Sequence, residues 1–273
     1  MDDVERAFEQ SEDAGRAALA RIALAPPRDV PSDPHSPTYR EYQFALYRAI
    51  SGRSSYVVAN ETSPFDLNHA KLRPFPHQTG SPAVVGEQLI AQGFLLKALS
   101  FLPPKARLLE FGPGWGNTTL HFLQLGYSVK AVEIDEKFVE LVRHRGAAFA
   151  DQLDVVQGDM LSFTTADSFD AAIFFECFHH CADHVQLIRQ VKQMLRPGGV
   201  LVLASEPIGK YPYPWGVRLD GQSLWAMRRY GWLELGFETS YLFGVLEKEG
   251  FRVERRREPS LGTIADVVLA TRK

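Results

Sequence analysis

The segment at residues 110–117 (EFGPGWGN) carries three glycines, Gly112, Gly114 and Gly116. Glycine allows backbone angles that are closed to other residues, and it lets a ligand lie against the main chain. The segment follows an apolar run and precedes an amphipathic one, so we predict a strand, a turn and a helix. The helix start supplies unpaired N–H groups and a positive dipole end, which suit an anionic group. The segment therefore predicts a ligand-binding loop at the carboxyl end of a strand.

The glycine pattern departs from one common fingerprint. Dinucleotide-binding loops have the pattern G-x-G-x-x-G/A, in which the last position lets the helix pack closely on the strand. Gly112 and Gly114 match the first two positions, but Asn117 stands at the third. This mismatch argues against an oxidoreductase with a nucleotide cofactor, which stays as an alternative on the same fold.

Further carboxylates stand where the next apolar runs end. Glu133 ends the second run, where a carboxylate can accept two hydrogen bonds from ribose hydroxyls. Asp159 ends the third run and can accept a hydrogen bond from an adenine amino group, with Ile134 and Met160 as apolar walls. Glu176 ends the fourth run, and we count it with the cofactor-binding residues.

Cysteine and histidine are concentrated at residues 177–184 (CFHHCADH). Cys177 and Cys181 are four residues apart, as are His180 and His184, and such pairs share a face of a helix and suit zinc. The segment is, however, predicted to be the loop that follows a strand. We therefore expect it to bind no metal. His179 and His180 are instead candidates for a general base, since an imidazole titrates near neutral pH. The alternative is that they close the pocket or bond backbone carbonyls.

From residue 105 onwards, short apolar runs alternate with amphipathic ones, which predicts parallel strands joined by helices. The predicted strands span 107–111, 128–134, 153–157, 169–175 and 200–204, with helices at about 116–125, 136–147 and 183–195. The segment 196–199 is predicted as a turn. A helix at 238–249 and strands near 251–257 and 263–271 follow. The pattern indicates an α/β fold with a Rossmann-like, doubly wound sheet.

Residues 1–104 are predicted to form a mainly helical N-terminal accessory segment, followed by a second domain at 105–273. The expected helices span 2–25, 38–50 and 83–101, and a linker with five prolines at 26–37 separates the first two. The stretch 60–82 is turn-rich, and its part at 73–82 is a candidate for closing the pocket. Within the second domain we predict an aromatic-rich, irregular insertion at about 207–236. Its aromatic side chains favour either a contact with an acceptor or burial against the N-terminal helices.

The composition excludes several classes of protein. The 273-residue chain has a formal net charge of −3, so no basic excess points to nucleic acid or to an acidic membrane. Two cysteines exclude a disulfide-stapled scaffold. We find neither a signal peptide at the N-terminus nor an apolar run long enough to cross a membrane. We therefore expect a soluble, cytoplasmic protein with no nucleic-acid partner.

The motifs named above, in this order, resemble class I S-adenosylmethionine-dependent methyltransferases, in particular the small-molecule group of methyltransferase type 11. The resemblance covers about residues 105–208 and is weaker over 238–273. It implies a seven-stranded sheet whose last strand is antiparallel, and S-adenosyl-L-methionine as the cofactor. It also implies methyl transfer to a small-molecule or glycan acceptor, whose identity the sequence does not give.

The resemblance also implies roles for single residues. Glu110 would position the methionine ammonium, and the three glycines of the loop would line the methionine part of the cofactor. Glu133 would hold the ribose, and Asp159 would hold the adenine amino group. A non-catalytic protein that binds the cofactor without transferring its methyl group is the alternative from a different class.

Overall fold

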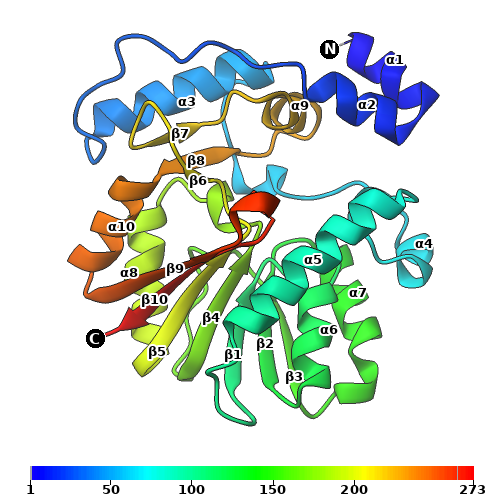
Figure 1. Cartoon of the computed structure of the whole chain (residues 1–273), viewed down its shortest axis with the longest axis vertical. Coiled ribbons are helices and arrows are strands. Elements are labelled where there is room, and N and C mark those ends of the chain that lie inside the picture. The colour runs from blue at the N-terminus through cyan, green and yellow to red at the C-terminus, as the bar shows by residue number, and fades with distance from the viewer. Residues whose placement is uncertain (1, 263) are drawn as a thin grey trace. The chain divides into compact units, whose positions relative to one another are not determined.

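The computed structural model describes residues 2–262 and 264–273 (Figure 1). Contacts divide the chain into two compact units. One unit, here called the sheet unit, comprises Ser63–Glu206 and Phe243–Lys273. The other, here called the smaller unit, comprises the chain up to Thr62 together with Pro207–Leu242. The division by contacts falls after Thr62, whereas the domain boundary predicted at 104/105 stays a prediction.

The sheet unit is built on a seven-stranded sheet with the strand order β3-β2-β1-β4-β5-β10-β9. Neighbours from β3 to β5 pair in parallel, and β10 is antiparallel to both β5 and β9. The predicted fold class, including the antiparallel last strand, is therefore confirmed. The strands are β1 (Arg107–Phe111), β2 (Ser128–Glu133), β3 (Leu153–Gln157), β4 (Phe169–Phe175), β5 (Leu195–Ala204), β9 (Phe251–Arg257) and β10 (Asp266–Arg272).

Helices cover both faces of this sheet, because the central strands β1, β4 and β5 are buried on both sides. Helices α5, α6 and α7 lie on one face, and α8 lies on the other (Figure 1). Side chains of the first three helices, such as Leu95, Phe122 and Val142, share one buried cluster with alternate strand residues such as Leu108 and Ile173. The bounds are α5 (Pro82–Ala98), α6 (Asn117–Gln124), α7 (Glu136–Arg145) and α8 (His184–Met194).

The start of β5 differs from the prediction. The segment 196–199 was predicted as a turn, but β5 already begins at Leu195, which pairs with Phe169. The next pair is Ala171 with Val200, so the register shifts between the two pairs. The Pro-Gly-Gly sequence thus forms an irregularity within the strand, as extra residues in a bulge do. In β10, which was predicted from residue 263, Thr263 lies outside the described residues.

The N-terminal helix predicted at 2–25 is two helices, α1 (Asp2–Gln10) and α2 (Glu12–Leu19). The break falls at Ser11, whose backbone is extended and whose hydroxyl accepts a hydrogen bond from Ala14 N. A serine in this position caps a new helix, and the apolar periodicity concealed this signal. Helix α3 (Pro37–Ser51) begins after the proline-rich linker with Ser36 as its cap, as expected for the helix predicted at 38–50.

The insertion predicted as irregular at 207–236 is ordered within the smaller unit, so that prediction was wrong. It contains β6 (Ile208–Gly209), β7 (Trp215–Val217), α9 (Gly221–Arg229) and the start of β8 (Leu235–Glu238). The three strands form a sheet in the order β6-β8-β7. Two-residue and three-residue strands are too short to give an alternating pattern in sequence.

Aromatic residues of the insertion pack on the N-terminal helices of the same unit. The ring centroids of Trp215 and Tyr39 are 5.2 Å apart, and those of Trp225 and Phe8 are 5.5 Å apart. Tyr47 of α3 donates a hydrogen bond from its hydroxyl to Gly231 O at 2.6 Å. Burial against the helices, one of the two interpretations of the aromatic cluster, therefore applies to Trp215 and Trp225. A contact between the insertion and an acceptor stays a prediction.

The turn-rich stretch also contains helix α4 (Leu67–Leu72), which contacts α7 within the sheet unit. Asp66 caps this helix by accepting hydrogen bonds from Asn68 N and His69 N. Helix α10 (Thr239–Lys248) leads from the insertion into β9. Among the described residues, no helix combines the length and the apolar character needed to cross a membrane.

Candidate functional site

The strand ends at one edge of the sheet bring the predicted site residues together. In register, Phe111 at the end of β1 pairs with Val132 and with Phe174, and Glu133 pairs with Gln157. The loops beyond the ends are also joined, since Gly112 N donates to Val132 O at 2.9 Å and Gly158 N donates to Glu133 O at 2.8 Å. The predicted cofactor residues therefore follow neighbouring strands at a common edge.

The glycine loop has the conformation that its sequence predicts. Gly112, Gly114 and Gly116 all have positive φ, at 57°, 51° and 71°. At Gly112 a side chain would also meet a neighbour, because a Cβ there would lie 3.0 Å from the Cβ of Cys177 and 3.1 Å from its Sγ. At Gly114 a Cβ would meet no atom within 4 Å, so only the backbone conformation demands glycine there. The loop thus has open space beside Gly114.

Glu133 is held rigidly at the end of β2. Its Oε2 accepts a hydrogen bond from Gly114 N at 3.0 Å, and its Oε1 accepts from Ile134 N at 2.8 Å and from Asp135 N at 3.0 Å. Burial raises the pKa of this carboxyl to about 7, although the three N–H donors oppose the shift. The side chain is 5% exposed. Its two oxygens offer about four lone-pair sites, so capacity for a further donor remains.

Glu110 lies under the loop rather than on its surface. Both of its oxygens accept hydrogen bonds from the first turn of α6, one from the Thr118 hydroxyl and one from the Thr119 hydroxyl at 2.5 Å. Burial is the main cause that raises its pKa to about 7, and the nearby carboxyl of Glu133 adds to the shift. Glu110 therefore fixes the start of α6 and with it the direction of the loop.

The residues predicted around the adenine are less buried. Asp159, Met160 and Ile134 are all partly exposed. The carboxylate of Asp159 accepts hydrogen bonds from Leu161 N at 3.3 Å and from Ser162 N at 3.2 Å. These two donors orient the side chain just beyond β3, with Ile134 beyond the adjacent strand β2.

Glu176 follows β4 with a positive φ of 54°, which is rare for a residue other than glycine. Its side chain is exposed, and its Oε2 accepts a hydrogen bond from Gln88 Nε2 of α5 at 3.1 Å. Its N–H donates to Ala204 O of β5 at 3.1 Å. Backbone strain of this kind is typical of functional sites.

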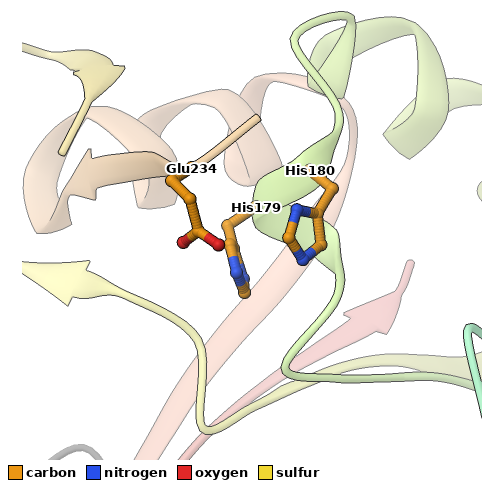
Figure 2. Close-up of side chains that lie close together, drawn as sticks. All are labelled: His179, His180 and Glu234. Atoms are coloured by element: carbon orange, nitrogen blue, oxygen red, sulfur yellow. The ribbon is translucent and has the colours of Figure 1, made fainter. Parts of the chain in front are cut away.

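The two candidate bases lie on the turn after β4. The imidazole rings of His179 and His180 lie side by side with centroids 4.2 Å apart (Figure 2). His179 is buried, and its Nδ1 lies 2.7 Å from Oε2 of Glu206. A buried carboxylate of the sheet unit therefore orients His179.

Glu206 was not among the predicted site residues. It follows β5 and is 2% exposed. Its Oε1 accepts hydrogen bonds from Cys177 N at 2.8 Å and Phe178 N at 2.9 Å, and its Oε2 accepts one from His179 N at 3.2 Å. Burial raises its pKa to about 7. The signal in the sequence was a carboxylate two residues after the apolar strand at 200–204, which is comparable to Glu133 at the end of its own strand.

The segment 177–184 forms a turn and the start of α8. Cys177 and Cys181 are both buried free thiols. Sγ of Cys177 lies 3.1 Å from Phe111 O, and burial raises the pKa of this thiol well above its ordinary value. The thiol therefore packs beneath the glycine loop. The expectation that this segment binds no metal stays a prediction.

The segment at 63–80 is fastened to the glycine loop and to α7. Asn117, at the position where the dinucleotide fingerprint has Gly or Ala, donates from Nδ2 to Pro74 O at 2.9 Å. Trp115 packs against Phe65 at 5.0 Å between ring centroids, and its carbonyl accepts a hydrogen bond from Arg145 of α7. These contacts hold the segment at the side of the loop. Its role in closing the pocket stays a prediction.

Comparisons with known proteins agree with this geometry. A family model described as a methyltransferase domain matches residues 109–203. A mitochondrial ribosomal RNA small subunit methyltransferase from Arabidopsis thaliana is 36% identical over 93 residues, which cover 32% of this chain and 24% of that protein. A ubiquinone biosynthesis O-methyltransferase from Xanthomonas oryzae pv. oryzae is 31% identical over 102 residues, which cover 37% of this chain and 43% of that protein.

The fold also matches solved structures. The glycopeptide N-methyltransferase MtfA, complexed with S-adenosyl-L-methionine, superimposes with a TM-score of 0.51 at 20% identity, covering 66% of this chain and 92% of that one. The chain spans less than half the length of the two curated relatives named above. Residues 109–203 thus match a methyltransferase domain, and the sheet unit has the fold of S-adenosyl-L-methionine-dependent methyltransferases.

Proposed function

We propose that the protein transfers the methyl group of S-adenosyl-L-methionine to a small-molecule or glycan acceptor. The observation that carries the proposal is the hydrogen bond between Gly114 N and Glu133 Oε2, which joins the glycine loop to the carboxylate of the next strand. In a methyltransferase domain, the loop would suit the methionine part of the cofactor and the carboxylate beside it would suit the ribose, and this supports the proposal.

The residues present fit this cofactor. The open space at Gly114 allows a ligand to approach the main chain, which a side chain at a positive φ would hinder. Glu133 would accept hydrogen bonds from the ribose hydroxyls, and Asp159 would accept one from the adenine amino group between Ile134 and Met160. Gly112 and Gly116 would complete the methionine side of the loop.

Two further carboxylates have proposed roles on the methionine side. Glu176 is exposed and is oriented by Gln88, so it would attract the ammonium group. Glu110 would act on the ammonium through the field of its carboxylate and through the loop, because Thr118 and Thr119 occupy its oxygens. Both proposals are tested by the effect of a neutral amide at these positions on cofactor affinity.

S-adenosyl-L-methionine supplies a methyl group on a sulfonium that is already an activated leaving group. The protein therefore has to align the acceptor and exclude water. A base is needed where the acceptor atom carries a proton that has to leave. His179 and His180 are the candidates, and the contact of His179 with Glu206 favours His179.

Alternative functions differ in what they bind and release. A non-catalytic protein would bind the cofactor and give no methylated product, and an oxidoreductase would bind a nicotinamide cofactor instead.

Nucleic acid is a further possible acceptor because of the ribosomal RNA methyltransferase among the relatives, although the alignment covers 32% of this chain. The net charge of −3 favours an acceptor other than nucleic acid. We also propose a cytoplasmic location.

The experiment is a methyl-transfer assay with cofactor labelled in its methyl group. Purified protein is incubated with a set of hydroxylated aromatic compounds, a set of oligosaccharides and glycopeptides, and ribosomal RNA in parallel. We expect label in a small-molecule or glycan product together with S-adenosylhomocysteine. Label in RNA alone would contradict the acceptor class, and cofactor binding without any labelled product would favour the non-catalytic alternative.

A further inference from the structure

The loop between β1 and α6 lies along one stripe of helix α7. Phe138, Val142 and Arg145 are spaced four and three residues apart, so they share one face of this helix. The ring of Phe138 contacts that of Trp115, with the ring centroids 5.0 Å apart. A Cβ at Gly116 would lie 3.1 Å from Cγ2 of Val142. Arg145 completes the stripe, because its guanidinium donates a hydrogen bond to the carbonyl of Trp115.

Arg145 makes the polar contact of this stripe with a charge that has no counterpart nearby. Its side chain is partly exposed, and burial lowers the pKa of the guanidinium to about 10. Among the residues that the structure describes, no carboxylate raises this pKa again by pairing with the charge. The guanidinium still stays cationic at neutral pH. Its hydrogen bond to the carbonyl of Trp115 is therefore charge-assisted, which makes it stronger than a bond between neutral groups.

The peptide unit between Trp115 and Gly116 is held at both ends. Its carbonyl accepts the hydrogen bond from Arg145. Its N–H, which belongs to Gly116, donates to Pro113 O at 2.9 Å and closes a four-residue turn. The two bonds together fix the orientation of this peptide and, with it, the second half of the glycine loop.

The first half of the loop has a different anchor. Gly114 N donates to Oε2 of Glu133, the carboxylate that is proposed to hold the ribose. The contact of Arg145 is made one residue later, at the carbonyl of Trp115, and does not involve Glu133. The loop is therefore anchored separately on two sides, by Glu133 at the end of β2 and by Arg145 near the end of α7.

We propose that Arg145 is a positioning residue for the methionine part of the cofactor, which it serves by holding the carbonyl of Trp115. In this role Arg145 acts through the loop and not by contact with the ligand. The inference rests on the proposed function, in which the loop lines the methionine part of S-adenosyl-L-methionine. It assigns to Arg145 a contribution to affinity that is separate from the ribose contact of Glu133.

Two ligands distinguish the two sides of the loop. S-adenosylhomocysteine contains both the nucleoside and the amino acid part of the cofactor. The compound 5′-methylthioadenosine keeps the nucleoside and the sulfur but lacks the amino acid part. Isothermal titration with both ligands therefore shows whether a variant has lost affinity for the methionine part alone.

The variant Arg145→Met removes the hydrogen-bond donors and keeps an unbranched apolar stem. We expect it to bind S-adenosylhomocysteine about tenfold more weakly than the wild type, which is the loss that one hydrogen bond to a charged group causes. Its affinity for 5′-methylthioadenosine should change by less than about twofold, because the contact of Glu133 with the loop remains. A merely structural role of Arg145 would weaken the binding of both ligands equally or of neither, and either result overturns the proposal.

Arg143→Met is the matched control. Arg143 lies in the same last turn of α7 and also donates to a backbone carbonyl, that of Val155 at 2.7 Å. This carbonyl belongs to β3 and not to the glycine loop. We therefore expect Arg143→Met to bind both ligands as the wild type does. A selective loss of S-adenosylhomocysteine binding in Arg143→Met as well would contradict a specific role of Arg145.

NMR on the wild type tests the proposal independently of how the variant folds. In protein labelled with nitrogen-15 arginine, the guanidinium signals report rotation about the Nε–Cζ bond, and the Arg145 signal is assigned by its loss in Arg145→Lys. We expect slower rotation at Arg145 than at the exposed Arg252. A contact that favours binding of the methionine part is itself strengthened by that binding. S-adenosylhomocysteine should therefore slow this rotation further, and 5′-methylthioadenosine should not; equal effects of the two ligands, or none, overturn the proposal.

Failure of the proposed function gives a different result. Wild type that binds neither ligand, or S-adenosylhomocysteine alone, contradicts the cofactor or the nucleoside contacts proposed for Glu133 and Asp159. Wild type that binds both ligands, together with an Arg145→Met variant that keeps its affinity for S-adenosylhomocysteine, contradicts the role of Arg145 and leaves the proposed function intact.

Discussion

The backbone N–H of Gly114 donates a hydrogen bond to Oε2 of Glu133 at 3.0 Å. This bond joins the loop after β1 to the end of β2, and Gly114 forms it from a backbone with a positive φ of 51°. The carboxylate is therefore set beside the loop before any ligand arrives. A preorganised pair of this kind lowers the cost of ordering that binding would otherwise carry.

The variant Gly114→Ala separates the role of the loop in binding from its effect on stability. Gly126, between α6 and β2, is a matched control, because it also has a positive φ and open space at its Cβ position. Alanine at either site is expected to reduce the free energy of unfolding by about 1 kcal/mol. Isothermal titration should show at least a tenfold loss of cofactor affinity in Gly114→Ala alone. Equal affinity losses in both variants would contradict a specific role of the loop at Gly114 in cofactor binding.

Gly112→Ala is expected to destabilise the protein more than Gly114→Ala. Both positions have positive φ, but a Cβ at Gly112 also lies 3.0 Å from the Cβ of Cys177. We expect a loss of about 2 to 3 kcal/mol in the free energy of unfolding, because overpacking adds to the backbone strain. Urea denaturation measures both variants. Equal losses would show that the loop moves away from Cys177 without cost.

The pKa of Glu110, raised to about 7 by burial, predicts how stability depends on pH. The folded protein holds this proton more tightly than the unfolded chain, where the pKa is near 4.5. The unfolding free energy should therefore fall as pH rises from 4.5 to about 7, and one such carboxyl accounts for up to about 3 kcal/mol. Glu133 and Glu206 act in the same direction.

The variant Glu110→Gln measures how much of this pH dependence of stability comes from the Glu110 carboxyl. Its amide can still form hydrogen bonds with Thr118 and Thr119 but does not titrate. Urea denaturation at several pH values between 5 and 8 should show a smaller decrease in stability than in the wild type. A decrease of the same size in both proteins would mean that Glu110 does not hold the proton.

Asp159→Asn tests the adenine contact. A hydrogen bond to a carboxylate is stronger than one to a neutral amide, so we expect a loss of cofactor affinity of about tenfold, or about 1.4 kcal/mol. Asp151→Asn, at an exposed site before β3, is the matched control and should bind as the wild type does. Isothermal titration with S-adenosylhomocysteine checks both. An unchanged affinity in Asp159→Asn would limit the role of Asp159 to its hydrogen bonds with Leu161 and Ser162.

The sheet could be predicted from the sequence because its strands are short apolar runs that end in chemically distinct residues. Gly112, Gly114 and Glu133 are recognisable from their types and from their places after the runs. Residue type and order were sufficient to predict that these residues lie close together, since the carboxyl ends of parallel strands meet at one edge of the sheet.

The remainder depends on contacts between distant segments, which a local pattern does not contain. Glu206, which follows β5, accepts hydrogen bonds from residues 177–179, which follow the neighbouring strand β4. The two segments are far apart in the sequence, so a local pattern does not reveal this contact. Ser11 divides a continuous apolar stripe by capping a helix. The strands of the insertion are too short for periodicity to reveal them.

The central claim is tested most directly by isothermal titration of the wild type and of Glu133→Ala with S-adenosyl-L-methionine, S-adenosylhomocysteine and NADH. Glu136→Ala, at the exposed start of α7, is the control, and circular dichroism checks that each variant is folded. We predict micromolar binding of both sulfur compounds by the wild type and by Glu136→Ala, a loss of at least a hundredfold in Glu133→Ala, and no binding of NADH. Binding of NADH, or no binding of either sulfur compound by folded wild type freed of copurified ligand, would contradict the account.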